Sequence, residues 1–162
     1  MEYKILILAS EADLPITRAI ETHLRPLVRD GLVESISWSP EPTEDETSFD
    51  ALLRMGREAG MVIVVWSRHA AASEFFRDVF RPVLTRMMNE RLLVVPVWAD
   101  ATEKPLMLST RMGIPFTRDD PESSLATEPS PNRLYAGLAM SIRHTLEHES
   151  GRPPRPPTPW NR

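Results

Sequence analysis

The sequence lacks cysteine altogether, holds only six glycines in 162 residues, and contains no long apolar run. The absence of cysteine excludes disulfides, thiolate catalysis and cysteine-ligated metal centres. A membrane-spanning helix needs about 20 successive apolar residues, and the first apolar run is soon followed by acids rather than by a signal-peptide cleavage pattern. We therefore expect a cytoplasmic protein that makes no membrane contact.

An excess of basic residues is also missing, since the formal net charge is -4. Without a basic stripe to offset phosphate repulsion, nucleic acid is not an expected partner. The dinucleotide-binding GxGxxG, the Walker loop and the esterase GxSxG do not occur. The acidic segment 41–46 lacks the glycine of a calcium loop, and His144 and His148 lack the glutamate of a zinc-protease helix. No metal site is predicted.

What the chain does have is a series of short, strand-like segments. Residues 61–66 are all apolar and mostly β-branched, which favours a central buried strand. Segment 32–38 is more polar and fits an edge strand, while Pro96 predicts poor pairing or a bulge in the strand that contains it. The expected strands are residues 3–9, 32–38, 61–66, 92–98 and 113–117.

Helical periodicity fills the intervals between these strands. Asp13 can cap a first helix with Pro15 in its first turn, and Pro26 predicts a kink or an early stop there. Thr47 and Asp50 have the spacing of a capping pair for a second helix. Four apolar stripes follow helical spacing: Ile16, Ile20, Leu24, Leu27 and Val28; Phe49, Leu52 and Leu53; Phe76, Phe80, Val83, Leu84 and Met87; and Leu134, Leu138, Ile142 and Leu146.

Alternating strands and helices predict an α/β fold with a parallel sheet covered on both faces. With about five strands we expect a flavodoxin-like three-layer arrangement in the order 2-1-3-4-5. The folded domain should span residues 1–149. Residues 150–162 are rich in proline and arginine, which predicts an extended tail or linker to a further domain; a ligand for a proline-reading module is the alternative.

Candidate ligand-binding residues lie where strands should end, because open α/β sheets bind ligands at that edge. Trp38, Trp66 and Trp98 are expected at one rim, where they either stack on a base or seal the core. Ser73 is expected to begin the helix after the third strand, either as its own N-cap or as a phosphate site with Arg68 nearby. The full set of candidate binding residues is Ser10, Trp38, Trp66, Ser67, Arg68 and Ser73.

Several segments in order resemble the Toll/interleukin-1 receptor (TIR) domain, especially its bacterial members. They are ILILAS near the start, HLRPLVRDGLVESISW, VIVVWS with the following ASEFFRD, and LLVVPVW. The resemblance covers about residues 1–148 and implies the flavodoxin-like fold. It also implies one of two kinds of work: assembly with other TIR domains as a signalling scaffold, or cleavage of the glycosidic bond of NAD+.

For NAD+ cleavage, the resemblance implies a glutamate about six or seven residues beyond Ser73, where this chain has Val79 and Phe80. Neither side chain can stabilise an oxocarbenium ion or activate a nucleophile. Glu74 and Asp78 are the only nearby candidates for a substitute catalytic acid. A phosphoacceptor receiver domain shares the topology but needs an aspartate where this chain has Trp66.

We therefore expect a signalling and interaction module of a bacterial defence or signalling system that has lost NAD+ cleavage. Its expected partners are other TIR-like domains or a downstream effector, including further copies of itself. No cofactor is assigned. The alternative is an active NAD+ nucleosidase (glycohydrolase) or a binder of an NAD-derived nucleotide, with NAD+ as substrate or ligand.

Overall fold

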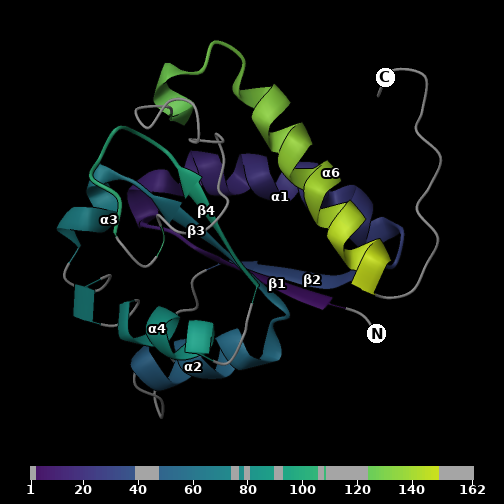
Figure 1. The fold of residues 1–162 in the computed structure, drawn as a ribbon, viewed down its shortest axis with the longest axis horizontal. Helices are drawn as coiled ribbons and strands as arrows, with labels where there is room; N and C mark the ends of the chain where they lie inside the picture. Colours follow the sequence, from purple (N-terminus) through teal and green to yellow (C-terminus); the bar gives the residue numbers. More distant parts are fainter. Residues whose placement is uncertain are drawn as a thin grey trace.

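A computed structural model of the chain describes residues 3–38, 48–73, 77–78, 81–89, 93–105, 108 and 124–149. Its centre is a parallel sheet of β1 (Tyr3–Leu8), β2 (Val33–Trp38), β3 (Met61–Trp66) and β4 (Leu93–Trp98), in the order β2-β1-β3-β4 (Figure 1). This confirms the predicted order for the first four strands. The predicted fifth strand, residues 113–117, and the proline-rich segment 150–162 lie outside the described residues.

Helices cover both faces of the sheet (Figure 1). One face carries α1 (Leu14–Arg29) and α6 (Pro131–Glu149); the other carries α2 (Ser48–Glu58) and α4 (Arg81–Asn89). Shorter elements include η1 (Glu11–Asp13), α3 (Arg68–Ala72) and η3 (Leu125–Thr127). The result is a three-layer α/β fold.

The two cores follow from the alternation of side chains along each strand. Ile5 and Ile7 face α1 and α6, whereas Leu6 and Leu8 face α2 and α4. Every residue of β3 is buried, as predicted for a central strand covered on both faces. The stripe of α6 is also confirmed, with Leu138, Ile142 and Leu146 buried against the first core: at most 3% of each is exposed.

The edge strand β2 carries an irregularity that sets the direction of its last residues. Tyr3 pairs with Val33 and Lys4 with Ser35, so Glu34 has no partner in the register and is exposed. One extra residue reverses the alternation beyond it. As a consequence Val33, Ile36 and Trp38 all contact the core beneath α1 and α6.

Helix α1 differs from its prediction in two respects. Pro26 does not stop the helix early. The helix continues to Arg29, and the Pro26 carbonyl accepts a hydrogen bond from the Asp30 N–H at 2.9 Å. Val28, expected on the inward stripe, is 37% exposed. The helix ends with Asp30 as its C-cap, and Gly31 adopts φ +76°, a left-handed conformation that glycine accepts without strain.

The pairing of β4 with β3 is regular. The register runs without a shift from Met61 paired with Leu93 to Trp66 paired with Trp98, so the predicted bulge at Pro96 does not occur in this pairing.

In the described parts of the chain, no helix has the length and apolar character that crossing a bilayer requires. The expected capping residue Thr47 lies outside them.

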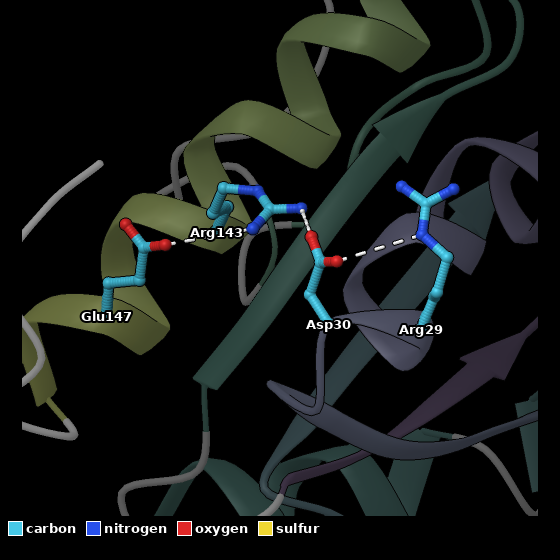
Figure 2. Close-up of polar contacts among 4 residues, drawn as sticks. All are labelled: Arg29, Asp30, Arg143 and Glu147. Carbon is cyan, nitrogen blue, oxygen red and sulfur yellow. Dashed lines mark hydrogen bonds and ion pairs between the residues drawn. The ribbon is translucent and has the colours of Figure 1, made fainter. Parts of the chain in front are cut away.

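A polar cluster joins the C-terminal ends of α1 and α6 (Figure 2). Arg143 of α6 donates to Asp30 with 2.7 Å between Nη2 and Oδ2, and its Nη1 lies 3.7 Å from Glu147. Arg29 approaches the other Asp30 oxygen at 3.7 Å from the exposed side. Asp30 carries negative charge where the α1 dipole is also negative, and Arg143 compensates both.

Candidate functional site

The candidate site lies at the C-terminal edge of the sheet, where β3 and β4 end in paired tryptophans. Trp66 and Trp98 are direct register partners and belong to the core beneath α2 and α4. Trp38 pairs with Ile7, which is level with Ile63, and contacts the opposite core. Each of the three tryptophans closes its strand as predicted. Trp38 nevertheless lies on the opposite face of the sheet from Trp66 and Trp98, because the extra residue in β2 turns it there.

A buried hydrogen bond connects the ends of β1 and β3. Ser67, immediately after β3, donates its hydroxyl hydrogen to the Asp13 carboxylate, and the same oxygen accepts the Ala70 N–H at 3.2 Å as the N-cap of α3. Asp13 occupies the N-cap position of α1, but its side chain makes no capping bond there. Only 6% of Asp13 and 1% of Ser67 is exposed, so each side chain satisfies a buried polar partner.

A second carboxylate, Asp100, connects the end of β4 to the start of α3. It accepts the Arg68 N–H at 3.0 Å, the Thr102 N–H at 3.1 Å and the Thr102 hydroxyl. Partial burial alone would raise the pKa of the Asp100 carboxyl. The hydrogen bonds from Thr102 and Arg68, with the charge of Arg68, outweigh this desolvation and hold the pKa below its ordinary value. Asp100 is therefore ionised at neutral pH and accepts hydrogen bonds from Arg68 and Thr102.

Beside these bonds lies a pocket of about 540 Å³ between α3, α4 and the chain after β4. The described residues that line it are Trp66, Ala71, Arg77, Arg81, Leu84, Thr102, Glu103, Lys104, Pro105 and Leu108. The Trp66 indole N–H donates to the Glu103 carbonyl at 2.8 Å, and the Lys104 ammonium lies 5.0 Å from the ring centre of Trp98. Both tryptophans thus help to position the chain after β4.

A short helix precedes the predicted helix start at Ser73. It is α3, which begins at Arg68 with Ser67 as its N-cap and has Ser73 as its C-cap. The Ser73 carbonyl then accepts the Arg77 N–H at 3.1 Å, a bond of helical spacing, while residues 74–76 lie outside the described residues. Arg68 is therefore helical rather than in a loop, and its side chain is exposed. The physical reason is that a serine directly after the strand can cap the chain at once. Ser10 instead caps η1, where it accepts the Ala12 N–H at 3.4 Å.

The two candidate acids have different outcomes. Asp78 is 62% exposed and forms a 3.0 Å ion pair with its neighbour Arg77; this carboxyl raises the pKa of the guanidinium further. Glu74 lies outside the described residues, as do Val79 and Phe80. Asp78 is not among the residues that line the pocket.

Sequence reasoning missed most of the residues that the structure brings together here. Asp100 and the nearby Thr102 could have been identified from the sequence. A carboxylate two residues beyond a buried strand is expected at the ligand edge of a parallel sheet. Asp13 was expected only as a helix cap. Nothing in the pattern indicated Arg81 or Lys104, because surface cations carry no periodicity that ties them to a pocket.

Metal binding finds no support among the described residues. They contain no group of three or more histidine, aspartate or glutamate side chains that could hold an ion. His144 and His148 lie on α6 with ring centres 6.5 Å apart and nearly parallel. The acidic segment 41–46 lies outside the described residues.

No protein-family profile matches the chain, and no curated protein matches it. Solved structures do match. One is a TIR-domain chain of the activated Roq1 resistosome directly recognising the pathogen effector XopQ, with 15% sequence identity and a TM-score of 0.47. The alignment covers 86% of this chain and 84% of that chain. A likeness at this level assigns neither a ligand nor an activity.

Proposed function

We propose that this chain is a TIR-like signalling module that acts by assembly with other copies or related domains, and that it does not cleave NAD+. The proposal is supported by where the resembling segments fall. ILILAS is the end of β1 with Ser10, VIVVWS is β3 with Ser67, and LLVVPVW includes β4. These strands are neighbours in the sheet. A bacterial defence or signalling system in the cytoplasm is the setting we propose for it.

The observation that carries the loss of cleavage is the position of Asp78. It is the acid closest to the place where the resemblance implies a catalytic glutamate, yet it is 62% exposed and ion-paired with Arg77. Cleavage of a glycosidic bond requires a carboxylate directed at the sugar. The other edge acids, Asp13 and Asp100, are engaged in internal hydrogen bonds. Asp13 and Asp100 therefore hold the chain, whereas Asp78 forms an exposed pair with its neighbour.

The test is nicotinamide release from NAD+, measured with the protein alone and with the protein clustered on a multivalent scaffold. We expect no release above the buffer rate in either state, and concentration-dependent self-association by light scattering. Turnover that disappears in Asp78→Asn or Glu74→Gln would refute the proposal. Glu58→Gln is the matched control, because Glu58 is also about half exposed and ion-paired, with Arg54 on α2.

A second candidate function is NAD+ cleavage or nucleotide binding at the pocket, and one observation favours it. Glu103 lines the pocket beside Trp66, which places a carboxylate near an aromatic surface. In that case nicotinamide release would persist in Asp78→Asn and disappear in Glu103→Gln. Calorimetry that detects no binding of NAD+ or ADP-ribose would exclude this candidate.

A further inference from the structure

Helix α6 carries two of the four histidines of the chain, His144 and His148, one turn apart on its exposed side. Their ring centres lie 6.5 Å apart and their planes differ by 16°. Residues four positions apart share one face of a helix, so the two rings stand side by side over the same stretch of surface. Within one copy of the chain this pair is an incomplete metal site, because the described residues contain no group of three or more potential ligands.

The distance between the rings is close to what two ligands of one zinc ion require. Zinc binds a histidine nitrogen at about 2.0–2.1 Å, which places the metal about 3.2 Å from the centre of the ring. Two such ligands at a tetrahedral angle have their ring centres about 5 Å apart. The observed 6.5 Å is slightly larger. Because both side chains are exposed, a small change in their torsion angles brings the rings to a shared ion.

The chemistry of the pair selects zinc rather than magnesium or calcium. Imidazole nitrogen is a common zinc ligand, whereas magnesium and calcium prefer oxygen. His148 is the penultimate residue of α6, where the helix dipole is negative and favours a cation. The neighbouring Glu147 does not add a ligand, because it lies against Arg143 at 3.7 Å and its side chain is only 8% exposed.

The face of α6 that presents these rings is open in the described part of the chain. Met140 lies one turn before His144 and is 51% exposed. A side chain placed at Gly137, on the same face, would meet nothing within 4 Å. A second copy of the chain can therefore approach this face of α6 closely, and it would cover Met140.

We propose that Zn²⁺ joins two copies of this chain through His144 and His148 of each copy. Two ligands fall short of the four that a tetrahedral site needs, and a second copy related by two-fold symmetry supplies the same two. Each copy has a formal net charge of -4, so contact between copies costs like-charge repulsion, which a divalent cation at the contact reduces. The inference goes beyond the proposed function, because a zinc-bridged pair requires neither assembly through other surfaces nor the loss of NAD+ cleavage.

The experiment combines calorimetric titration of the full chain with ZnCl₂ and sedimentation velocity in EDTA, in MgCl₂ and in ZnCl₂. We expect zinc to bind with one ion per two chains. At a protein concentration where the EDTA sample is mainly monomeric, zinc should raise the dimer fraction about fivefold or more. Magnesium should leave the dimer fraction unchanged, and excess EDTA should reverse the effect of zinc.

Substitution of either histidine tests the ligands. His144→Asn and His148→Asn should each weaken zinc binding about tenfold or more and remove the zinc-dependent dimer, because each chain then keeps one ligand. His69→Asn is the matched control, since His69 is also exposed on a helix, α3, but has Ser73 four residues later. It should bind zinc within about twofold of the wild type. Thermal unfolding in EDTA should be the same for all three variants and the wild type.

Four outcomes would overturn the inference: no change in the dimer fraction with zinc, the same change with magnesium, one zinc per chain without a dimer, or equal loss of zinc binding in His69→Asn. Self-association in EDTA that zinc leaves unchanged would support the proposed assembly and overturn the zinc bridge. A zinc-dependent dimer of a protein that stays monomeric in EDTA at every concentration would do the reverse. Failure here and failure of the proposed function are thus distinguishable.

Discussion

Substituting Arg143 with methionine should expose how much the cluster at the ends of α1 and α6 contributes to stability. Methionine keeps most of the apolar stem and removes the charge. Asp30 would lose a 2.7 Å charge-assisted hydrogen bond, and Glu147, whose side chain is 8% exposed, would lose its nearby cation (Figure 2). Both carboxylates would remain in partly desolvated positions, Asp30 at the negative end of the α1 dipole.

The expected loss in free energy of unfolding follows from how exposed the Arg143 and Asp30 side chains are. Removing one partner of a fully buried ion pair costs about 3–5 kcal/mol, and an exposed pair contributes about 0.2–1 kcal/mol. The side chains of Arg143 and Asp30 are 22% and 16% exposed, so we expect Arg143→Met to cost about 2–3 kcal/mol. Arg29→Met is the matched control: Arg29 approaches the same carboxylate but is 77% exposed and 3.7 Å away. Its cost should be about 0.5 kcal/mol or less.

The assay is urea unfolding at pH 7 of the wild type, the two arginine variants, Asp30→Asn and the Asp30→Asn/Arg143→Met double variant. For a chain of this length, a loss of 2–3 kcal/mol corresponds to a decrease in Tm of about 5–10 °C. The double-mutant cycle should give a coupling energy of about 1–3 kcal/mol between Asp30 and Arg143. Equal costs for the two arginine variants, or a coupling energy below about 0.5 kcal/mol, would refute the reasoning.

Three further predictions concern the edge of the sheet and the end of α1. Ser67→Ala should cost about 2–3 kcal/mol in urea unfolding, because it removes the α3 cap and leaves buried Asp13 without its donor; a cost below about 0.5 kcal/mol would contradict this role. Asp100→Asn should cost about 1–2 kcal/mol at pH 7. The folded pKa of Asp100 is lowered from its ordinary value of 3.8. The wild type should therefore have the larger free energy of unfolding above that value, and this difference should disappear as pH falls through the lower folded pKa. A difference in free energy of unfolding that is constant with pH would argue against this. Gly31→Ala should cost about 1–2 kcal/mol, because alanine is strained at φ +76°; an unchanged unfolding midpoint would contradict the strain.

The sequence predicted the sheet well because burial leaves a simple pattern. The unbroken apolar run of β3 and the more polar β2 correctly indicated a central and an edge strand. The predictions that failed concern residues whose environment depends on tertiary packing rather than on the local sequence pattern. Val28 fits the helical spacing but is 37% exposed, and Pro26 lies inside α1, which continues to Arg29.

The site was less predictable, because its residues meet through register rather than through spacing. A single extra residue in β2 turns Trp38 away from Trp66 and Trp98, and no local pattern marks such a bulge. Ser67, a candidate binding residue, does lie at this edge, directly after β3. Its partner Asp13 belongs to η1, 54 residues earlier in the chain, so the pair is visible only after β1 and β3 are placed side by side.

The arrangement of acids at this edge bears on how mutational data would be interpreted. Asp13 and Asp100 join three strand ends through hydrogen bonds to Ser67, Arg68 and Thr102, so their variants should lose any activity because the edge loses its geometry. Asp78 and Glu103 are exposed, so their variants should retain stability. Loss of activity without loss of stability would therefore identify a catalytic acid only at these exposed positions. At Asp13 or Asp100, a loss of activity would be accompanied by a loss of stability, and it would not distinguish an acid that reacts from an acid that only supports the site.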